Sequence, residues 1–138
     1  METEPVSEVV IVSEYDIVLA RKGIREAAVE CGFGLTDVTR IVTAASELSR
    51  NVFLYAGEGV VTWHVLHGAH VGLELRFIDH GPGIEDLDKA MQPGFTSGRG
   101  MGMGLPGAKR LMDEMLIETE AGLGTTVIVR KWLSSRFE

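Results

Sequence analysis

A carboxylate stands at the end of one strongly alternating stretch of the sequence. Apolar and charged residues alternate over 73–77, so in a β-strand the apolar side chains share one face, and Asp79 is the next residue on that face. A carboxylate there needs either a donor from the protein or a ligand that supplies one. Gly81 and Gly83 follow and allow a sharp turn close to a ligand. A strand that ends in an ordinary Asp-Gly turn would give the same residues.

An acid and an amide lie four residues apart on a predicted helix. The helix runs from Thr36 or Asp37 to about Ala56, and Glu47 and Asn51 fall side by side at the edge of its apolar stripe. Such a carboxylate can act as a general base, and an amide oxygen one turn away can bind a metal ion. The solvated edge of an ordinary helix would also fit this pair.

The third candidate feature is a glycine-rich segment. Residues 92–104 are too flexible for a helix or a strand and too long for a simple turn. Leu105 then begins a predicted helix that ends near Glu114, with Pro106 in its first turn. Glycine backbone that leads into a helix N-terminus favours an anion such as phosphate, because free N–H groups and the helix dipole both attract negative charge.

Other patterns predict the elements that position these residues. Ser13 and Asp16 resemble a capping box at the start of a helix that ends near Cys31, and a tight turn at 67–70 leads into the strand that carries Asp79. Further strands are predicted at 8–13, 60–67, 115–120 and 125–132, and a short helical stretch at 84–91.

The composition is that of one globular domain. The chain has 138 residues, of which 45% are hydrophobic and 24% charged. No apolar run is long enough to span a membrane, the first residues are acidic where a signal peptide is basic, and a single Cys31 fits a reducing compartment. We therefore expect a cytoplasmic protein. The net charge of −7 argues against a nucleic-acid or membrane surface, and the four histidines lack the spacing of a metal site.

Common nucleotide-binding motifs do not account for the glycines. Residues 102–107 satisfy G-x-G-x-x-G, but no predicted strand precedes them and no βαβ unit surrounds them, which excludes a dinucleotide fold. The Walker A pattern and the V-A-I-K, H-R-D and D-F-G motifs of eukaryotic-type protein kinases are absent from the sequence.

Four segments of the sequence are best considered together: 47–51, 79–83, 100–105 and 122–125. In chain order they resemble the N box and three G boxes of the Bergerat-type (GHKL) ATPases, which include gyrase, Hsp90, histidine kinases and MutL. Within that superfamily the chain is similar to the bacterial anti-sigma and switch-protein serine kinases, and most similar to the RsbT-like kinases of the stressosome.

The resemblance covers almost the whole chain and implies a fold. We expect residues 1–138 to form a single GHKL-type kinase domain with a flexible ATP lid at about 92–104. The implied architecture is a two-layer α/β sandwich, with a mixed, mostly antiparallel sheet and helices on one face.

The resemblance also implies roles on the adenine side and in catalysis. Asp79 would accept a hydrogen bond from the adenine amino group, Gly81 and Gly83 would pass close to the base, and Thr125 would lie nearby. Glu47 would be the general base for an attacking serine. Asn51 would supply an oxygen to Mg²⁺.

The lid residues have implied roles toward the phosphates. Gly100, Gly102 and Gly104 would let the lid fold over them, and N–H groups at the start of the Leu105 helix would face them. Arg99 is the candidate lid cation, with a solvated loop arginine as the alternative.

The implied activity is an ATP- and Mg²⁺-dependent protein serine/threonine kinase. By resemblance, it would phosphorylate a STAS-domain antagonist or scaffold protein, leave the complex, and then bind a PP2C-type phosphatase or another downstream regulator. Self-association stays open. The alternatives are an anti-sigma factor that binds a sigma factor directly, a non-catalytic ATP-regulated binding module, and an α/β domain without a ligand. Co-purification of the partner separates the first alternative, and a phosphate-transfer assay separates the second.

Overall fold

Five strands form a single sheet in the computed structural model, which describes residues 6–92 and 104–133. Their order is β1-β2-β3-β5-β4, and all four pairings are antiparallel. No parallel pair therefore occurs among the described strands, whereas the sequence predicted a mixed, mostly antiparallel sheet. The strands are β1 (Ser7–Ile11), β2 (Gly59–Leu66), β3 (Gly72–Asp79), β4 (Glu114–Glu120) and β5 (Gly124–Trp132).

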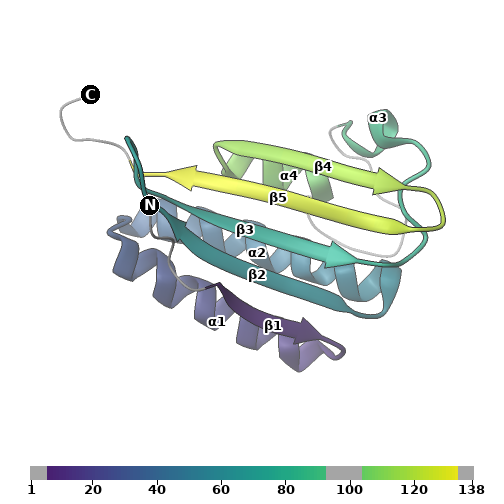
Figure 1. The fold of residues 1–138 in the computed structure, drawn as a ribbon, viewed down its shortest axis with the longest axis horizontal. Helices are drawn as coiled ribbons and strands as arrows, with labels where there is room; N and C mark the ends of the chain where they lie inside the picture. Colours follow the sequence, from purple (N-terminus) through teal and green to yellow (C-terminus); the bar gives the residue numbers. More distant parts are fainter. Residues whose placement is uncertain (1–5, 93–103, 134–138) are drawn as a thin grey trace.

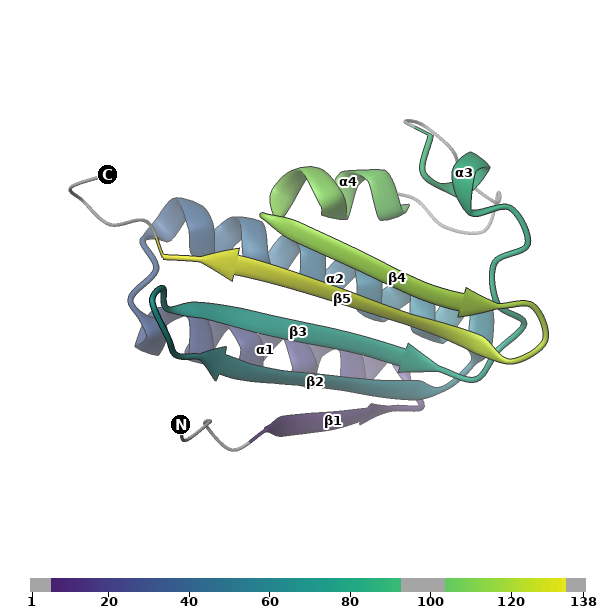
Figure 2. The same cartoon turned by 45° about the horizontal axis from the view of Figure 1, so that its top comes forward.

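Helices cover one face of this sheet, as Figures 1 and 2 show. The helices on that face are α1 (Glu14–Cys31), α2 (Leu35–Ala56) and α4 (Gly104–Leu111), and α3 (Leu87–Ala90) is a single turn near one end of the sheet. The predicted two-layer α/β fold is confirmed. None of the helices within the described part of the chain is long and apolar enough to cross a membrane.

The core lies between the sheet and the helices. The apolar face of β3 contributes Leu75 and Phe77, with exposed fractions of 0% and 1%, and α2 contributes Ile41, Leu48 and Val52 from its apolar stripe. The alternation in β3 and the helical spacing in α2 therefore both face the same core, as predicted.

The first helix begins and ends as its sequence indicates. Asp16 Oδ2 accepts hydrogen bonds from the backbone N–H groups of Val12 and Ser13, each at 3.0 Å. At the other end Gly32 adopts a left-handed conformation with φ of 109°, and its N–H donates to carbonyl oxygens of the last turn.

Two helical predictions were too long. The helix predicted to reach Glu114 ends at Leu111, because Asp113 and Glu114 already pair with β5: the Asp113 N–H donates to the Arg130 carbonyl oxygen at 2.9 Å. The stretch predicted at 84–91 is helical only over Leu87–Ala90, where Asp86 caps the start by accepting from the Lys89 N–H at 3.0 Å.

A buried carboxylate helps to fix the register between β3 and β5. Glu74 is 2% exposed on the face of β3 away from the helices, and it accepts hydrogen bonds from Arg76 Nε at 2.8 Å and Arg130 Nε at 2.6 Å. Burial alone would raise the pKa of Glu74, but the hydrogen bonds from the two arginines outweigh it and lower the pKa below its usual value. The pairing matters for Asp79, because a slip of one residue would move Asp79 to the other face of the sheet.

We expect Glu74→Gln to destabilise the fold in a pH-dependent way. Because the folded-state pKa is lowered, the carboxylate contributes stability above its unfolded pKa of about 4.3, and this contribution is lost as pH falls through the folded pKa. At pH 7 the variant should lose about 1–3 kcal/mol in the free energy of unfolding, measured by urea titration. The difference from wild type should shrink below about pH 4.

Glu8→Gln is the matched control, since Glu8 is an exposed carboxylate on the same sheet face. Its effect should stay within about 0.5 kcal/mol. A Glu74→Gln deficit that is the same at pH 3 and pH 7 would contradict the ion-pair explanation.

Candidate functional site

Asp79 is held by two backbone donors at the end of β3. Its Oδ1 atom accepts from the Gly81 N–H at 2.9 Å and from the Thr125 N–H at 3.3 Å. Thr125 lies directly opposite Asp79 in the β3–β5 register. Both contacts go to Oδ1, and no residue in the described part of the chain donates a hydrogen bond to the second carboxylate oxygen, Oδ2. The half-buried Asp79 thus has both a donor in the protein and room for a ligand.

The C-terminal half of α2 lies directly against this strand end. A Cβ added to Gly81 would lie 2.6 Å from Ala56 Cβ, and a Cβ added to Gly59 would lie 2.5 Å from Val52 Cγ1 and 3.4 Å from Asp79 Cβ. Glycine is therefore required where the backbone approaches the helix this closely. Asn51, which precedes Val52 and is half-buried, belongs to the same part of α2.

Glu47 lies one helical turn before Asn51 and is mostly buried. Its side chain is 15% exposed, and its Oε1 atom pairs with Arg50 Nη1 at 3.5 Å. The arginine side chain is itself 43% exposed. The helical arrangement predicted for Glu47 and Asn51 is therefore present, and Arg50 adds a cation beside the predicted base that sequence reasoning did not assign to the site.

The loop after Asp79 docks onto the turn between β4 and β5. The Gly122 N–H donates to the Pro82 carbonyl oxygen at 2.8 Å. Gly83 has a φ of 77°, and a Cβ there would clash with the Glu120 carbonyl oxygen. Two of the predicted glycine-containing segments, 79–83 and 122–125, are far apart in sequence but contact each other in the structure.

Thr119 joins these segments, and sequence reasoning missed it. Its hydroxyl accepts from the Ile84 N–H at 2.9 Å, lies 2.9 Å from the Thr125 hydroxyl and lies 3.3 Å from the Gly124 carbonyl oxygen. A signal was present: Thr119 continues the helix-facing side of β4 after Ile117, just as Asp79 continues that of β3. Alternation alone does not show which polar residues meet.

A cavity of about 290 Å³ opens where these strand ends converge. Its size and its mixture of carboxylate, hydroxyl and apolar groups suit a small ligand. Its lining residues are Asp79, His80, Glu118, Thr119, Glu120, Leu123, Gly124, Thr125 and Thr126.

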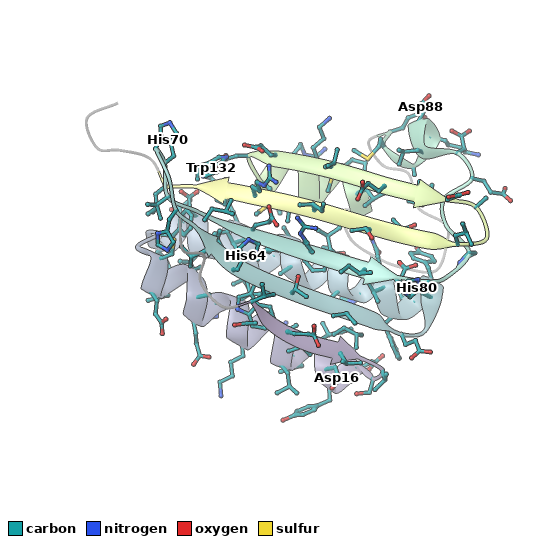
Figure 3. All side chains as sticks on the ribbon, viewed as in Figure 1. Asp16, His64, His70, His80, Asp88 and Trp132 are labelled. Atoms are coloured by element: carbon teal, nitrogen blue, oxygen red, sulfur yellow. The ribbon has the colours of Figure 1, made fainter. Side chains whose placement is uncertain are left out.

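The histidines are spread along the sheet. Figure 3 places His80 at the same end of β3 as the cavity, with His70 and Trp132 at the opposite end. The His70 and Trp132 rings meet edge to face, with centroids 6.4 Å apart. Within residues 6–92 and 104–133, no group of three or more His, Cys, Asp or Glu side chains is arranged to hold a metal ion.

The predicted lid is described only at its two ends, Gln92 and Gly104. Gly104 and Leu105 begin α4, which packs against α2. The other predicted lid residues, Arg99, Gly100 and Gly102, lie outside the described residues.

Comparison with known proteins agrees with this geometry. Residues 36–135 match the profile of the family described as histidine kinase-, DNA gyrase B-, and HSP90-like ATPase. The chain belongs to this family. The segments that resemble the N box and the G boxes, from Glu47 to Thr125, all fall within the match, so the family predicted from the sequence is confirmed.

Within this family, the chain is similar to a bacterial serine/threonine-protein kinase and to an anti-sigma factor. The chain is 48% identical over 124 residues to the serine/threonine-protein kinase RsbT of Bacillus subtilis (strain 168), covering 89% of this chain and 93% of that protein. It is 33% identical over 123 residues to the anti-sigma F factor of Thermoanaerobacter sp. (strain X514), covering 84% and 85% of the two chains.

A solved structure shares the fold. The RsbU and RsbW domains of Rv1364c from Mycobacterium tuberculosis align with a TM-score of 0.65 at 20% identity. The alignment covers 98% of this chain and 35% of the other. At this identity the likeness supports the two-layer fold alone.

We expect Gly81→Ala to weaken ADP binding. The added Cβ would meet Ala56 Cβ at 2.6 Å, well inside normal contact, so the turn that donates to Asp79 must move away from α2. The loss of affinity should be about tenfold or more, with about 1–3 kcal/mol lost in the free energy of unfolding. Isothermal titration and urea unfolding measure the two effects.

Gly68→Ala is the control, because nothing lies within 4 Å of a Cβ at that position. It should bind ADP like wild type. Equal ADP affinities for Gly81→Ala and Gly68→Ala would show that the close approach to α2 has no part in the site.

Proposed function

We propose that this protein is an ATP- and Mg²⁺-dependent protein serine/threonine kinase that acts by partner switching. The observation that carries the proposal is the placement of the Glu47–Asn51 helical pair in the half of α2 that packs against the Asp79 strand end. The 48% identity to a serine/threonine-protein kinase over most of the chain supports the same activity.

Adenine recognition would depend on Asp79. Oδ1 is occupied by the two backbone N–H groups, so the carboxylate is fixed in orientation and Oδ2 can accept from the exocyclic amine. A charged acceptor makes this hydrogen bond stronger than a neutral one would. Gly81 and Gly83 keep the following turn narrow beside the base.

The residues on α2 fit a magnesium nucleotide. Mg²⁺ usually keeps several waters and takes only one or two oxygen ligands from the protein besides the phosphate oxygens. The amide oxygen of Asn51 would therefore be a sufficient protein ligand. When bound, the ion would neutralise charge on the phosphate oxygens. Asn51 would orient the triphosphate relative to Glu47, one turn away on the same helix.

Glu47 would act as the general base for phosphoryl transfer. One carboxylate oxygen is paired with Arg50, which leaves Oε2 to accept the proton of an incoming serine or threonine hydroxyl. The hydroxyl oxygen forms a bond to the γ-phosphorus as the bond between that phosphorus and the bridging oxygen of ADP breaks. The products are the phosphorylated partner and ADP.

Backbone at the start of α4 would contribute to phosphate binding. The N–H groups of Gly104 and Leu105 lie in the first turn of α4, where no helical carbonyl pairs with them. Pro106 has no N–H to lose there. We propose that Gly100 and Gly102 let the lid close over the phosphates and that Arg99 supplies a cation.

A STAS-domain protein is the proposed substrate, with a PP2C-type phosphatase or another regulator as the partner after release. The RsbT relative and the anti-sigma F factor support a regulator that exchanges protein partners. We propose a cytoplasmic location, which fits the compartment of such regulators and the single cysteine.

Direct binding of a sigma factor is the second candidate. It is favoured by the 33% identity to an anti-sigma F factor over 84% of the chain. Co-purification distinguishes the two: recovery of a sigma factor supports the second candidate, and recovery of a STAS-domain protein supports the first.

Two substitutions should separate catalysis from binding. Glu47→Ala should abolish phosphate transfer from Mg-ATP to a STAS-domain partner while ATP binding survives, because the base is lost and the adenine contacts remain. Asp79→Asn should weaken ATP binding itself by at least about tenfold, because it replaces a charged acceptor. Transfer of radiolabelled phosphate and isothermal titration are the two measurements.

Glu26→Ala, an exposed acid on α1, and Asp88→Asn on α3 are the matched controls and should behave like wild type. Transfer by Glu47→Ala at the wild-type rate would exclude Glu47 as the base. Unchanged ATP affinity in Asp79→Asn would place the adenine elsewhere.

A further inference from the structure

We propose that Lys131 is a positioning residue for phosphate binding, which holds α4 so that the N–H groups of its first turn face the nucleotide. The inference rests on the proposed nucleotide site and deepens it, because it concerns how the protein fixes the helix that would bind the phosphates. It starts from a buried lysine that has no role in the site described so far: Lys131 is 7% exposed.

Lys131 occupies a strand position where the pattern predicts an apolar side chain. On β5, Val127 and Val129 face the helices and belong to the core, and Lys131 is the next residue on that face. Lysine is almost never buried without a partner, because the ammonium group loses its hydration. The partners of the ammonium group therefore indicate what Lys131 does there.

Groups from α2, from α4 and from the segment after α4 surround the Lys131 ammonium. Its Nζ atom donates to the carbonyl oxygen of Leu111, the last residue of α4, at 2.8 Å. It also lies 3.7 Å from Asp37 Oδ1, in the first turn of α2, and 3.4 Å from Asp113 Oδ1. Lys131 therefore connects the end of α4 to the start of α2 and to β5.

The hydrogen bond to Leu111 is made at the end of α4, where a helix lacks partners of its own. The last carbonyl groups of a helix have no intrahelical donor, and a cation beside them also interacts favourably with the helix dipole. α4 has only 8 residues, so its placement depends on contacts with the rest of the protein. It packs against α2 with Ala108 in the core, and Lys131 adds a contact at its C-terminal end.

The position of the Leu111 end of α4 determines the position of the other end. Eight residues span about 12 Å, so a tilt of about 5° about Leu111 would move the first turn by about 1 Å. Donor–acceptor distances in hydrogen bonds vary by only about 0.5 Å, so such a tilt would weaken bonds to a phosphate. Figure 2 shows that α4 begins on the side of the molecule where β3 ends. Lys131 therefore keeps the N–H groups of Gly104 and Leu105, the proposed phosphate donors, on the side of the proposed adenine site.

The test separates the phosphate half of the nucleotide from the adenine half. ADP and adenosine are titrated in the presence of Mg²⁺ against wild type and Lys131→Met, which keeps an unbranched apolar side chain without the ammonium group. Lys131→Met should bind ADP about tenfold more weakly, the equivalent of one charge-assisted hydrogen bond, while its adenosine affinity stays within about twofold of wild type. A lysine that only stabilises the fold would leave the ratio of ADP affinity to adenosine affinity unchanged.

Amide hydrogen exchange supplies a second readout that needs no nucleotide. In Lys131→Met the amides of residues 108–112, at the end of α4, should exchange at least about tenfold faster than in wild type, because the helix end is no longer held. The amides of β2, which pairs with β1 and β3, should exchange at the wild-type rate. Faster exchange in both places would indicate a general loss of stability instead.

Two further variants complete the design. Lys109→Met removes the same charge from an exposed position on α4 and should leave the ratio of ADP affinity to adenosine affinity unchanged. Lys131→Gln has a shorter, uncharged side chain that cannot replace the ammonium group, so it should lower the ratio as well. It takes the place of Lys131→Met if that variant does not fold.

The outcomes are distinct. Equal losses of ADP and adenosine affinity in Lys131→Met, or no loss of either, overturn the role of Lys131 and leave the proposed kinase site standing. The same drop in the ratio for Lys109→Met also overturns it, because the loss of charge alone would then explain the effect. A wild-type protein that binds neither ADP nor adenosine overturns both the proposed function and this inference.

Discussion

The fixed orientation of one carboxylate determines what this site can do. Asp79 ends an apolar strand face, where an unpaired charge would be costly. The protein stabilises it with backbone N–H groups from the following turn and from β5, both directed to the same oxygen. Backbone donors cannot be removed by side-chain motion, so they fix the orientation of this carboxylate, which lines the cavity.

That arrangement constrains the surrounding fold. The donor from Thr125 exists only in the observed β3–β5 register, which the ion pair between the buried Glu74 and Arg130 supports from the other face of the sheet. The donor from Gly81 requires a turn that passes against Ala56 at the end of α2. The same packing places Val52 and Ala56, in the half of α2 that also carries Asn51 and Glu47, against the end of β3. In the proposed function, adenine recognition at Asp79 and phosphate chemistry on α2 therefore both depend on the packing of α2 against the end of β3.

Much of this could be predicted from sequence because the important signals are local. Alternation identified Asp79 as the polar end of a buried face, and helical spacing placed Glu47 beside Asn51; the structure has both arrangements. Pairing is not local. The contacts of Thr119 and the antiparallel pairing of all five described strands depend on which strands become neighbours. The end of α4 at Leu111 depends likewise on the pairing of the following residues with β5, which helix periodicity cannot reveal.

The most direct measurement is a crystal structure of the protein with Mg²⁺ and a non-hydrolysable ATP analogue. The account predicts that the exocyclic amine of adenine lies at about 3 Å from Asp79 Oδ2, with the triphosphate directed toward Asn51 on α2. An adenine ring bound away from the end of β3, or one whose amine does not contact Asp79, would contradict it.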